Sequence, residues 1–190
     1  MRERRSSIPL RRPVFVGCEG ESESGYAGLL QDMIRAANVS VHLLIADLGI
    51  GAGDPFSRVA MAVRKLEQLR RTRTAPFDRF VLLDSDQADS DRDRAIAARS
   101  LALQNGIQIV WQRPCFEAVI LRHLPRCATR RPPDSAEAKR ALHREWTDYE
   151  KPMARAELAR KIGLAAILQA ADVEPELNTM LRCIGLLRID

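Results

Sequence analysis

The sequence predicts an α/β fold, in which a mostly parallel β-sheet is flanked by helices and followed by a C-terminal helical extension. Between residues 13 and 124, short apolar stretches alternate with helical patterns in the order β-α-β-α-β-α-β-α. This alternation is typical of a parallel sheet whose right-handed crossovers place helices on both faces. Beyond residue 135 the pattern is helical throughout, over roughly 136–147, 153–170 and 176–187.

Four stretches have the length and apolarity of β-strands. The first covers residues 13–18, and the helical pattern after it begins at Tyr26. The second, residues 41–46, is almost continuously apolar, which fits burial on both faces of a parallel sheet. Residues 79–83 and 107–111 are expected to form the third and fourth strands.

The connections between these strands contain the remaining helices. A glycine-rich loop, residues 47–55, leads into an amphipathic helix, but it lacks the Gly-Lys-Ser/Thr and G-x-G-x-x-G patterns of phosphate-binding loops. An acidic loop is expected over residues 87–93, before a helix that Gly106 ends. The apolar positions of that helix include Ile96, Leu101 and Leu103. A short helix after Pro114 is expected to end at Pro125.

The chain is long enough for one domain with a substantial core, because it has 190 residues. Residues 1–12 are expected to form a disordered basic arm, and residues 13–125 the α/β core. Residues 126–135 form a basic, proline-containing linker, and residues 136–190 a helical extension packed on the core.

The composition indicates a soluble globular protein, with 46% hydrophobic and 29% charged residues. The cytoplasm is the expected compartment, because neither a membrane-spanning segment nor a signal peptide is recognised. No apolar run approaches the ~20 residues that span a bilayer, so no membrane contact is expected. The N-terminus is basic but lacks the apolar core of a signal peptide. The cysteines share no C-x-x-C spacing and are expected to be reduced and mostly packed: Cys18, Cys115, Cys127 and Cys183.

The charge distribution favours an anionic partner such as nucleic acid. The formal net charge is +5, and arginine, which suits bidentate phosphate contacts, far outnumbers lysine. Basic residues crowd the N-terminus and one later region, whose members are Arg122, Arg126, Arg130, Arg131, Lys139, Arg140 and Arg144. The alternative interpretation is an ordinary solvated surface.

Carboxylates follow two of the predicted strands at the points where these strands end. The first strand leads to Glu19, and the third leads to Asp84 and Asp86. Because sites in open α/β sheets lie at strand ends, we expect one divalent-metal site there. Two carboxylates ~4 Å apart repel by ~4 kcal/mol at an effective dielectric constant near 20, and Mg²⁺ would turn that repulsion into binding. The alternative is that Asp84-Ser-Asp86 is a polar turn that caps a helix.

Two other metal sites are disfavoured. The acidic segment 84–93 lacks the central Gly and terminal Glu of an EF-hand. Cys115, His123 and Cys127 match no standard zinc spacing, and Pro125 interrupts the helix between them.

Several motifs resemble those of a known family. Phe15-Val-Gly-Cys-Glu19-Gly-Glu-Ser-Glu23 resembles the opening motif of Toprim domains, and Leu83-Asp84-Ser-Asp86 resembles their aspartate-x-aspartate motif. Within that group the chain is similar to the RloB family. Arg113-Pro-Cys-Phe-Glu117 resembles its Asn-Pro-Cys-Phe-Glu signature, with Arg113 in place of Asn. Two later stretches, Trp146-Thr-Asp-Tyr-Glu-Lys151 and Glu174-Pro-Glu-Leu-Asn-Thr179, also resemble the family, and the resemblance covers most of residues 13–185.

The resemblance implies a Toprim-type nuclease that uses Mg²⁺ or Mn²⁺ to cut DNA or RNA in bacterial phage defence and abortive infection. A partner ATPase encoded nearby is expected, and an oligomer is left open. The resemblance makes Glu19 an acid/base or metal-side residue and makes Asp84 and Asp86 metal ligands. Glu23 and Glu117 are further catalytic candidates. The alternatives are a non-catalytic nucleic-acid binder and a subunit that docks on an ATPase through its C-terminal helices.

Overall fold

The computed structural model describes residues 11–49, 53–72 and 75–187. Most of the predicted basic arm lies outside the described residues, as does Gly51 of the glycine-rich loop. No helix in the described part of the chain combines the length and apolarity needed to cross a lipid bilayer.

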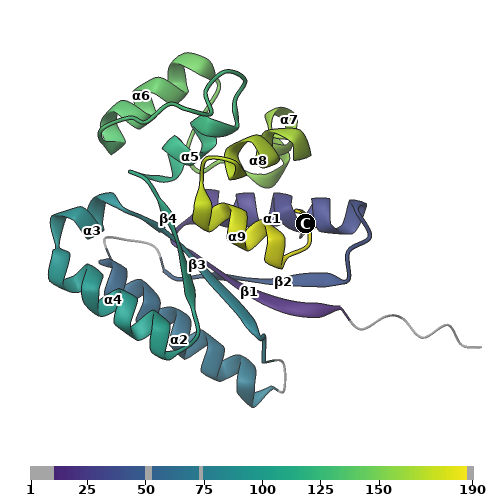
Figure 1. Cartoon of the computed structure of the whole chain (residues 1–190), viewed down its shortest axis with the longest axis vertical. Helices are drawn as coiled ribbons and strands as arrows, with labels where there is room; N and C mark the ends of the chain where they lie inside the picture. Colours follow the sequence, from purple (N-terminus) through teal and green to yellow (C-terminus); the bar gives the residue numbers. More distant parts are fainter. Residues whose placement is uncertain (1–10, 50–52, 73–74, 188–190) are drawn as a thin grey trace, which may run out of the picture.

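Four parallel strands form the sheet, in the order β2-β1-β3-β4 (Figure 1). Their bounds are Arg12–Cys18 for β1, Val41–Asp47 for β2, Asp78–Asp84 for β3 and Gln108–Gln112 for β4. The prediction of a parallel α/β sheet is therefore confirmed. The chain leaves β1 toward one edge of the sheet and returns on the other side of β1 as β3. The carboxyl ends of β1 and β3 thus form a topological switch point, where α/β sheets place their ligand crevices.

Helices cover both faces of the sheet. One face is packed by α1 (Glu21–Ala36) and α9 (Pro175–Cys183), and the other by α2 (Pro55–Arg71) and α4 (Arg92–Gln104) (Figure 1). The side chains of β1 and β3 alternate between these layers, as the period of two in a strand requires. The first layer receives Val14, Val16, Phe80 and Leu82, and the second receives Phe15, Val81 and Leu83.

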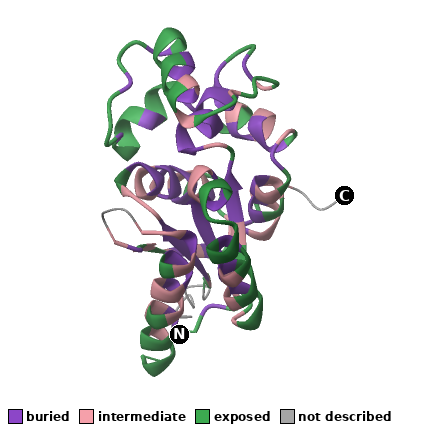
Figure 2. Ribbon diagram, turned by 90° about the vertical axis from the view of Figure 1, so that its left-hand side faces the viewer, coloured by how far each residue is buried: buried purple, intermediate pink, exposed green. Residues whose placement is uncertain are grey.

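A helical cap lies above the sheet and α1 in Figure 1. It consists of α5 (Phe116–His123), α6 (Ser135–Glu145), α7 (Arg155–Lys161) and α8 (Leu164–Ala171). Buried apolar residues of the cap belong to the same hydrophobic cluster as those of β1, β3 and α1. Figure 2 shows this continuity as buried segments that run from the sheet into the cap. The cap is thereby fixed over the carboxyl ends of the strands.

The start of α1 differs from its prediction. The helix begins at Glu21, whereas the apolar stripe begins only at Tyr26. The first turn of a helix can be polar, because its backbone N–H groups face solvent or a ligand and carry a partial positive charge. Glu21 and Glu23 lie in this turn. Glu23 consequently belongs to a helix rather than to a loop.

Two later predictions are also wrong in detail. The acidic segment 87–93 is mostly helical, because α3 (Asp86–Ser90) precedes α4. The single helix predicted over 153–170 is divided into α7 and α8 near Gly163, the N-cap of α8. Glycine disfavours a helix interior and so marks the break.

The packing face of α4 differs in part from the expected one, because Leu101 packs against the second layer as expected but the other two apolar positions do not. Ile96 and Leu103 are exposed, at 54% and 82% of their surface, while the buried positions are Ala95, Ala98 and Ala102. These small side chains let α4 pack closely against its neighbours in the second layer. The apolar stripe alone could not reveal this, because alanine contributes little to it.

Candidate active site at the switch point

Glu19 and Asp84 meet at the carboxyl ends of β1 and β3. Glu19 directly follows β1, and its Oε2 accepts a hydrogen bond from the backbone N–H of Asp84 at 3.1 Å. Asp84 ends β3, and its Oδ1 accepts from the backbone N–H of Phe116 at 2.7 Å, where α5 begins. The sheet register brings these residues together, as predicted from the two strand ends.

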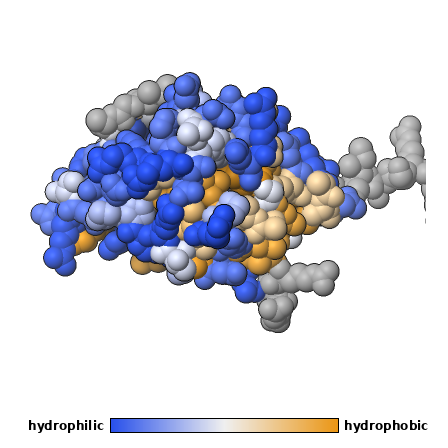
Figure 3. Space-filling view, turned by 90° about the horizontal axis from the view of Figure 1, so that it is seen from above, coloured by the Kyte–Doolittle hydropathy of each residue, from blue (hydrophilic) through white to orange (hydrophobic). Residues whose placement is uncertain are grey.

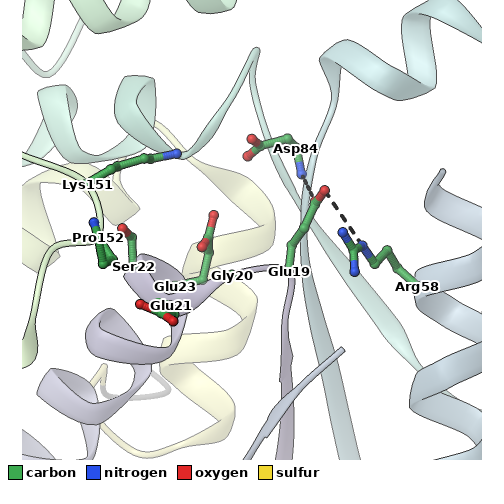
Figure 4. A pocket seen from close by; sticks show the side chains of 9 residues that line it. All are labelled: Glu19, Gly20, Glu21, Ser22, Glu23, Arg58, Asp84, Lys151 and Pro152. Atoms are coloured by element: carbon green, nitrogen blue, oxygen red, sulfur yellow. Dashed lines mark hydrogen bonds and ion pairs between the residues drawn. The ribbon is translucent and has the colours of Figure 1, made fainter. Parts of the chain in front are cut away.

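A pocket of about 390 Å³ opens beside this pair. Glu19, Glu23 and Asp84 approach it from β1, α1 and β3, while Lys151 extends from the opposite side (Figure 4). Glu23 is only 4% exposed. Three of the five predicted catalytic residues therefore share one pocket.

The environment of these acids disfavours their charged forms. Burial, and then the charges of Glu23 and Glu19, raise the pKa of Asp84 to about 8. Burial also raises the pKa of Glu19, although the Asp84 N–H and Arg58 partly offset this rise. The pKa of Glu23 is likewise raised by burial. Burial is the largest cause for all three acids, and perturbed groups of this kind are common at functional sites.

Arg58 is a buried cation on the α2 side of the pocket, and the sequence did not point to it. Its Nε lies 3.9 Å from Glu19 Oε1, and its guanidinium donates to the carbonyl oxygens of Leu48 and Gly49. Gly53 allows this approach, because a Cβ there would lie 3.1 Å from the guanidinium carbon. Arg58 thus ties the glycine-rich loop to the carboxylate that follows β1.

Lys151 reaches the pocket from a segment that is held against α1. The backbone N–H of Met153 donates to Ser22 Oγ at 3.0 Å. Gly25 permits the contact, because a Cβ on it would lie 2.6 Å from the carbonyl oxygen of Met153. The sequence placed Lys151 in a family-like stretch without giving it a role; only the packing against α1 brings its ammonium group to the pocket.

Glu117 does not line this pocket but pairs with Lys151, which does. Its Oε1 is 2.7 Å from Lys151 Nζ, and its side chain is 1% exposed. Burial pushes the pKa of Glu117 upward, but the hydrogen bond and charge of Lys151 outweigh this effect, so the pKa is lowered. Glu117 is therefore ionised and anchors the ammonium group of Lys151 beside the pocket.

Asp86 does not line this pocket. As the first residue of α3 it accepts from the backbone N–H of Gln87 through Oδ1, at 2.7 Å, and from Ser135 Oγ through Oδ2, at 2.6 Å. In the described residues, no three His, Cys, Asp or Glu side chains lie close enough to hold a metal ion. The assignment of Glu19, Asp84 and Asp86 to one metal stays a prediction.

His123 and the cysteines have structural environments. His123 Nδ1 lies 2.7 Å from the Val119 carbonyl oxygen, and its Nε2 lies 2.9 Å from the Tyr26 hydroxyl. Burial lowers the pKa of His123 to about 4, so the ring is neutral. Nδ1 must then donate to Val119, and Nε2 accepts from Tyr26. All four cysteines are free, and three of them are buried, as expected.

Comparison with known proteins identifies the family. The family model described as RloB-like protein matches residues 14–179. No curated protein and no solved structure gave a significant match. The match includes both strand ends, the start of α5 and the segment that carries Lys151. Together with the four-stranded parallel sheet and the helices that follow it, this match shows that the chain belongs to the RloB-like family.

Proposed function

We propose that this protein is a Mg²⁺- or Mn²⁺-dependent Toprim-type nuclease that cleaves phosphodiesters of DNA or RNA. The observation that carries this proposal is the gathering of Glu19, Glu23 and Asp84 in one pocket at the switch point of the sheet. Burial and then mutual repulsion raise the pKa values of these acids, and a divalent cation would offset the repulsion.

The donor groups fit a hard divalent cation. Mg²⁺ binds through one or two carboxylates together with water and substrate phosphate, and this pocket offers carboxylate oxygens but no sulfur or imidazole ligand. Asp84 and Glu19 would hold the ion. Asp86 would join them only if its Oδ2 left Ser135. When bound, the ion would supply Lewis-acid polarisation of the phosphate and stabilisation of the leaving oxygen.

Side chains around the pocket would supply the general base and the phosphate contact. Glu23, or Glu19 if Asp84 alone holds the ion, takes the proton from the attacking water, because a carboxylate with a raised pKa is a competent base near neutral pH. Lys151 binds a non-bridging phosphate oxygen, since its ammonium group lies at the pocket. Burial lowers the pKa of Lys151, but the hydrogen bond and charge of Glu117 outweigh this effect, so the pKa is raised and the group stays charged. Arg58 orients Glu19.

Membership of the RloB-like family supports a role in phage defence. We further propose abortive infection as the outcome and an ATPase as the partner. A nuclease of this kind must be restrained in an uninfected cell. Control by a partner would meet that need.

The test is a cleavage assay on single- and double-stranded DNA and on RNA, with Mg²⁺ or Mn²⁺, with and without the partner ATPase. The parent protein should cut at least one substrate, EDTA should stop it, and Asp84→Asn should reduce the rate by about a hundredfold or more. Asp93→Asn, which removes an exposed carboxylate from α4, is the matched control and should cut normally.

Cleavage by Asp84→Asn at the parent rate would exclude the proposed site. Salt-dependent binding of nucleic acid without cleavage under any metal would instead favour a non-catalytic binder. If Asp84→Asn retained the defence phenotype while loss of the C-terminal helices abolished ATPase binding, a docking subunit would be favoured.

A further inference from the structure

A second pocket, of about 830 Å³, lies on the other side of Lys151. Lys151 lines both pockets, so the two are adjacent. The first is lined mainly by carboxylates, whereas α6 gives the second Lys139, Arg140, His143 and Arg144. Figure 3 looks down on the helical cap and shows hydrophilic residues over the side where α6 lies in Figure 1. The acidic pocket thus continues directly into a basic one.

The basic residues share one face of α6 because of their spacing. Positions 139, 140, 143 and 144 are one, three and four residues apart, which places them on neighbouring turns of the same surface. All four are exposed. The opposite face is fixed in the core by Ala138, Ala141 and Leu142, and Asp134 caps the helix at its N-terminus. The charges are therefore carried by a firmly anchored helix.

Three other basic residues of this region are engaged in contacts within the cap, so the basic surface at the pocket is narrower than the sequence indicated. Arg122 is fully buried and paired with Glu174. Arg130 pairs with Glu145 at 2.8 Å, and Arg131 donates to the Val173 carbonyl oxygen at 3.1 Å. These contacts hold the cap together. The basic face of α6 is the part of the cluster that opens onto a pocket.

Glu137 occupies two of these basic groups. Its carboxylate oxygens lie 2.9 Å from Arg140 Nη2 and 2.8 Å from Arg144 Nη2. The hydrogen bonds from Arg144 and Arg140 lower the pKa of Glu137, so this carboxylate is ionised at neutral pH. A phosphate group that approached the two arginines would have to compete with it. Surface ion pairs of this kind are weak and exchange readily for another anion.

We propose that the basic face of α6, made of Lys139, Arg140 and Arg144, binds the phosphates of a nucleic-acid strand that flank the phosphate held at the carboxylate pocket. These three residues are called the basic track below. Glu137 acts as an internal competitor that these phosphates displace. The inference rests on the proposed function for the identity of the ligand and adds where the flanking nucleotides run. Lys151 marks the junction between the two pockets.

The first test measures binding in EDTA, where cleavage cannot occur. Fluorescence anisotropy is recorded with labelled single-stranded DNA, RNA and duplex DNA over a range of salt concentrations. In the triple variant Lys139→Gln/Arg140→Gln/Arg144→Gln, the affinity should fall about tenfold or more and the salt slope should fall by about 2. The control Arg64→Gln/Arg70→Gln/Arg71→Gln removes the same charge from α2 and should change both much less.

The second test uses Glu137→Gln, which should bind several-fold more tightly than the parent because the arginines are released. Glu67→Gln on α2 removes one exposed negative charge far from the track and should have a smaller effect. Equal gains in the two variants would overturn the role given to Glu137.

The proposal and the nuclease assignment fail separately. If the parent binds nucleic acid in EDTA but the α6 triple variant binds equally well, the track is wrong, whatever the cleavage assay gives. If no nucleic acid binds, or if polyglutamate competes as well as nucleic acid at equal charge concentration, the track is again wrong. Loss of binding in the triple variant, without cleavage in the parent, would keep the track and reject the nuclease.

Discussion

Glu19 and Asp84 are linked across the two central strands, because Glu19 Oε2 accepts the backbone N–H of Asp84 at 3.1 Å. The contact joins a side chain to a backbone group, so it survives substitution of the Asp84 side chain. The charge of Asp84 can therefore be changed without removing the hydrogen bond that holds Glu19. Substitutions of Asp84 thus test the electrostatics of the pocket separately from its geometry.

Asp84→Asn should stabilise the metal-free protein above acidic pH. The folded-state pKa of Asp84, about 8, is above its ordinary value of 3.8. The folded protein therefore holds this proton more tightly, and stability is lost as pH rises from about 4 to about 8. Asn removes that loss and can still accept the Phe116 N–H through Oδ1. We expect a gain on the order of 1 kcal/mol at pH 8 and little gain at pH 4.

Thermal unfolding in EDTA across this pH range measures the effect. Asp93→Asn serves as the control and should show no pH-dependent difference from the parent. A destabilised Asp84→Asn at pH 8 would contradict the raised pKa.

Divalent metal should raise the melting temperature through Asp84. At a metal concentration a hundred times the Kd, binding to the folded state alone would stabilise the parent by about 2.7 kcal/mol. Asp84→Asn should lose this shift. Ser135→Ala frees Asp86 Oδ2 from its hydrogen bond and should keep the shift. Titration with Mn²⁺ and Mg²⁺ in differential scanning fluorimetry measures it, and equal shifts in parent and Asp84→Asn would place the metal elsewhere.

Gly25→Ala should destabilise the protein and displace Lys151. Alanine normally favours a helix interior by ~1 kcal/mol over glycine. Here its Cβ would lie 2.6 Å from the Met153 backbone oxygen, so the segment that carries Lys151 must move. Gly28→Ala is the matched control, because its Cβ would meet only the flexible side chain of Arg155, at 3.0 Å.

The pair is read by melting temperature and by cleavage rate. We expect Gly28→Ala to be neutral or stabilising, and Gly25→Ala to lower both quantities. A Gly25→Ala protein as stable and active as Gly28→Ala would show that the strap of residues 151–153 need not contact α1.

Tyr26→Phe should destabilise the core by about 1–2 kcal/mol, because it leaves the buried Nε2 of His123 without its donor.

The parent should also lose stability as pH falls. The folded-state pKa of His123 is about 4, below its ordinary value of 6.5, so the unfolded chain binds the proton first and stability declines between pH 6.5 and pH 4.

Chemical denaturation at several pH values tests both statements. In His123→Leu the component of the pH dependence that comes from this ring should disappear. If the slope between pH 6.5 and pH 4 were unchanged in this variant, the neutral, buried state of His123 would be refuted.

The sheet, and the edge of it that carries the acidic residues, could be predicted from local sequence alone. The apolar runs that end in Glu19 and Asp84 predict two buried strands, which the structure pairs in parallel, and the edge at which both end. This was possible because a buried strand has a characteristic local pattern of apolar residues. The start of α1 and the packing face of α4 differ from their predictions. The first turn of α1 and the alanine face of α4 lack the large apolar residues on which periodicity depends.

Which groups share the site depends on contacts between elements that are far apart in the sequence. Lys151 reaches the pocket because a segment distant in sequence packs on Gly25. Arg58 reaches it because α2 packs on the sheet and brings the guanidinium group to Glu19. Asp86, two residues from Asp84, turns instead to Ser135 at the start of α6. Spacing along a chain determines periodicity within one element, but side-chain direction at a strand end and contacts between distant elements depend on packing of the whole fold.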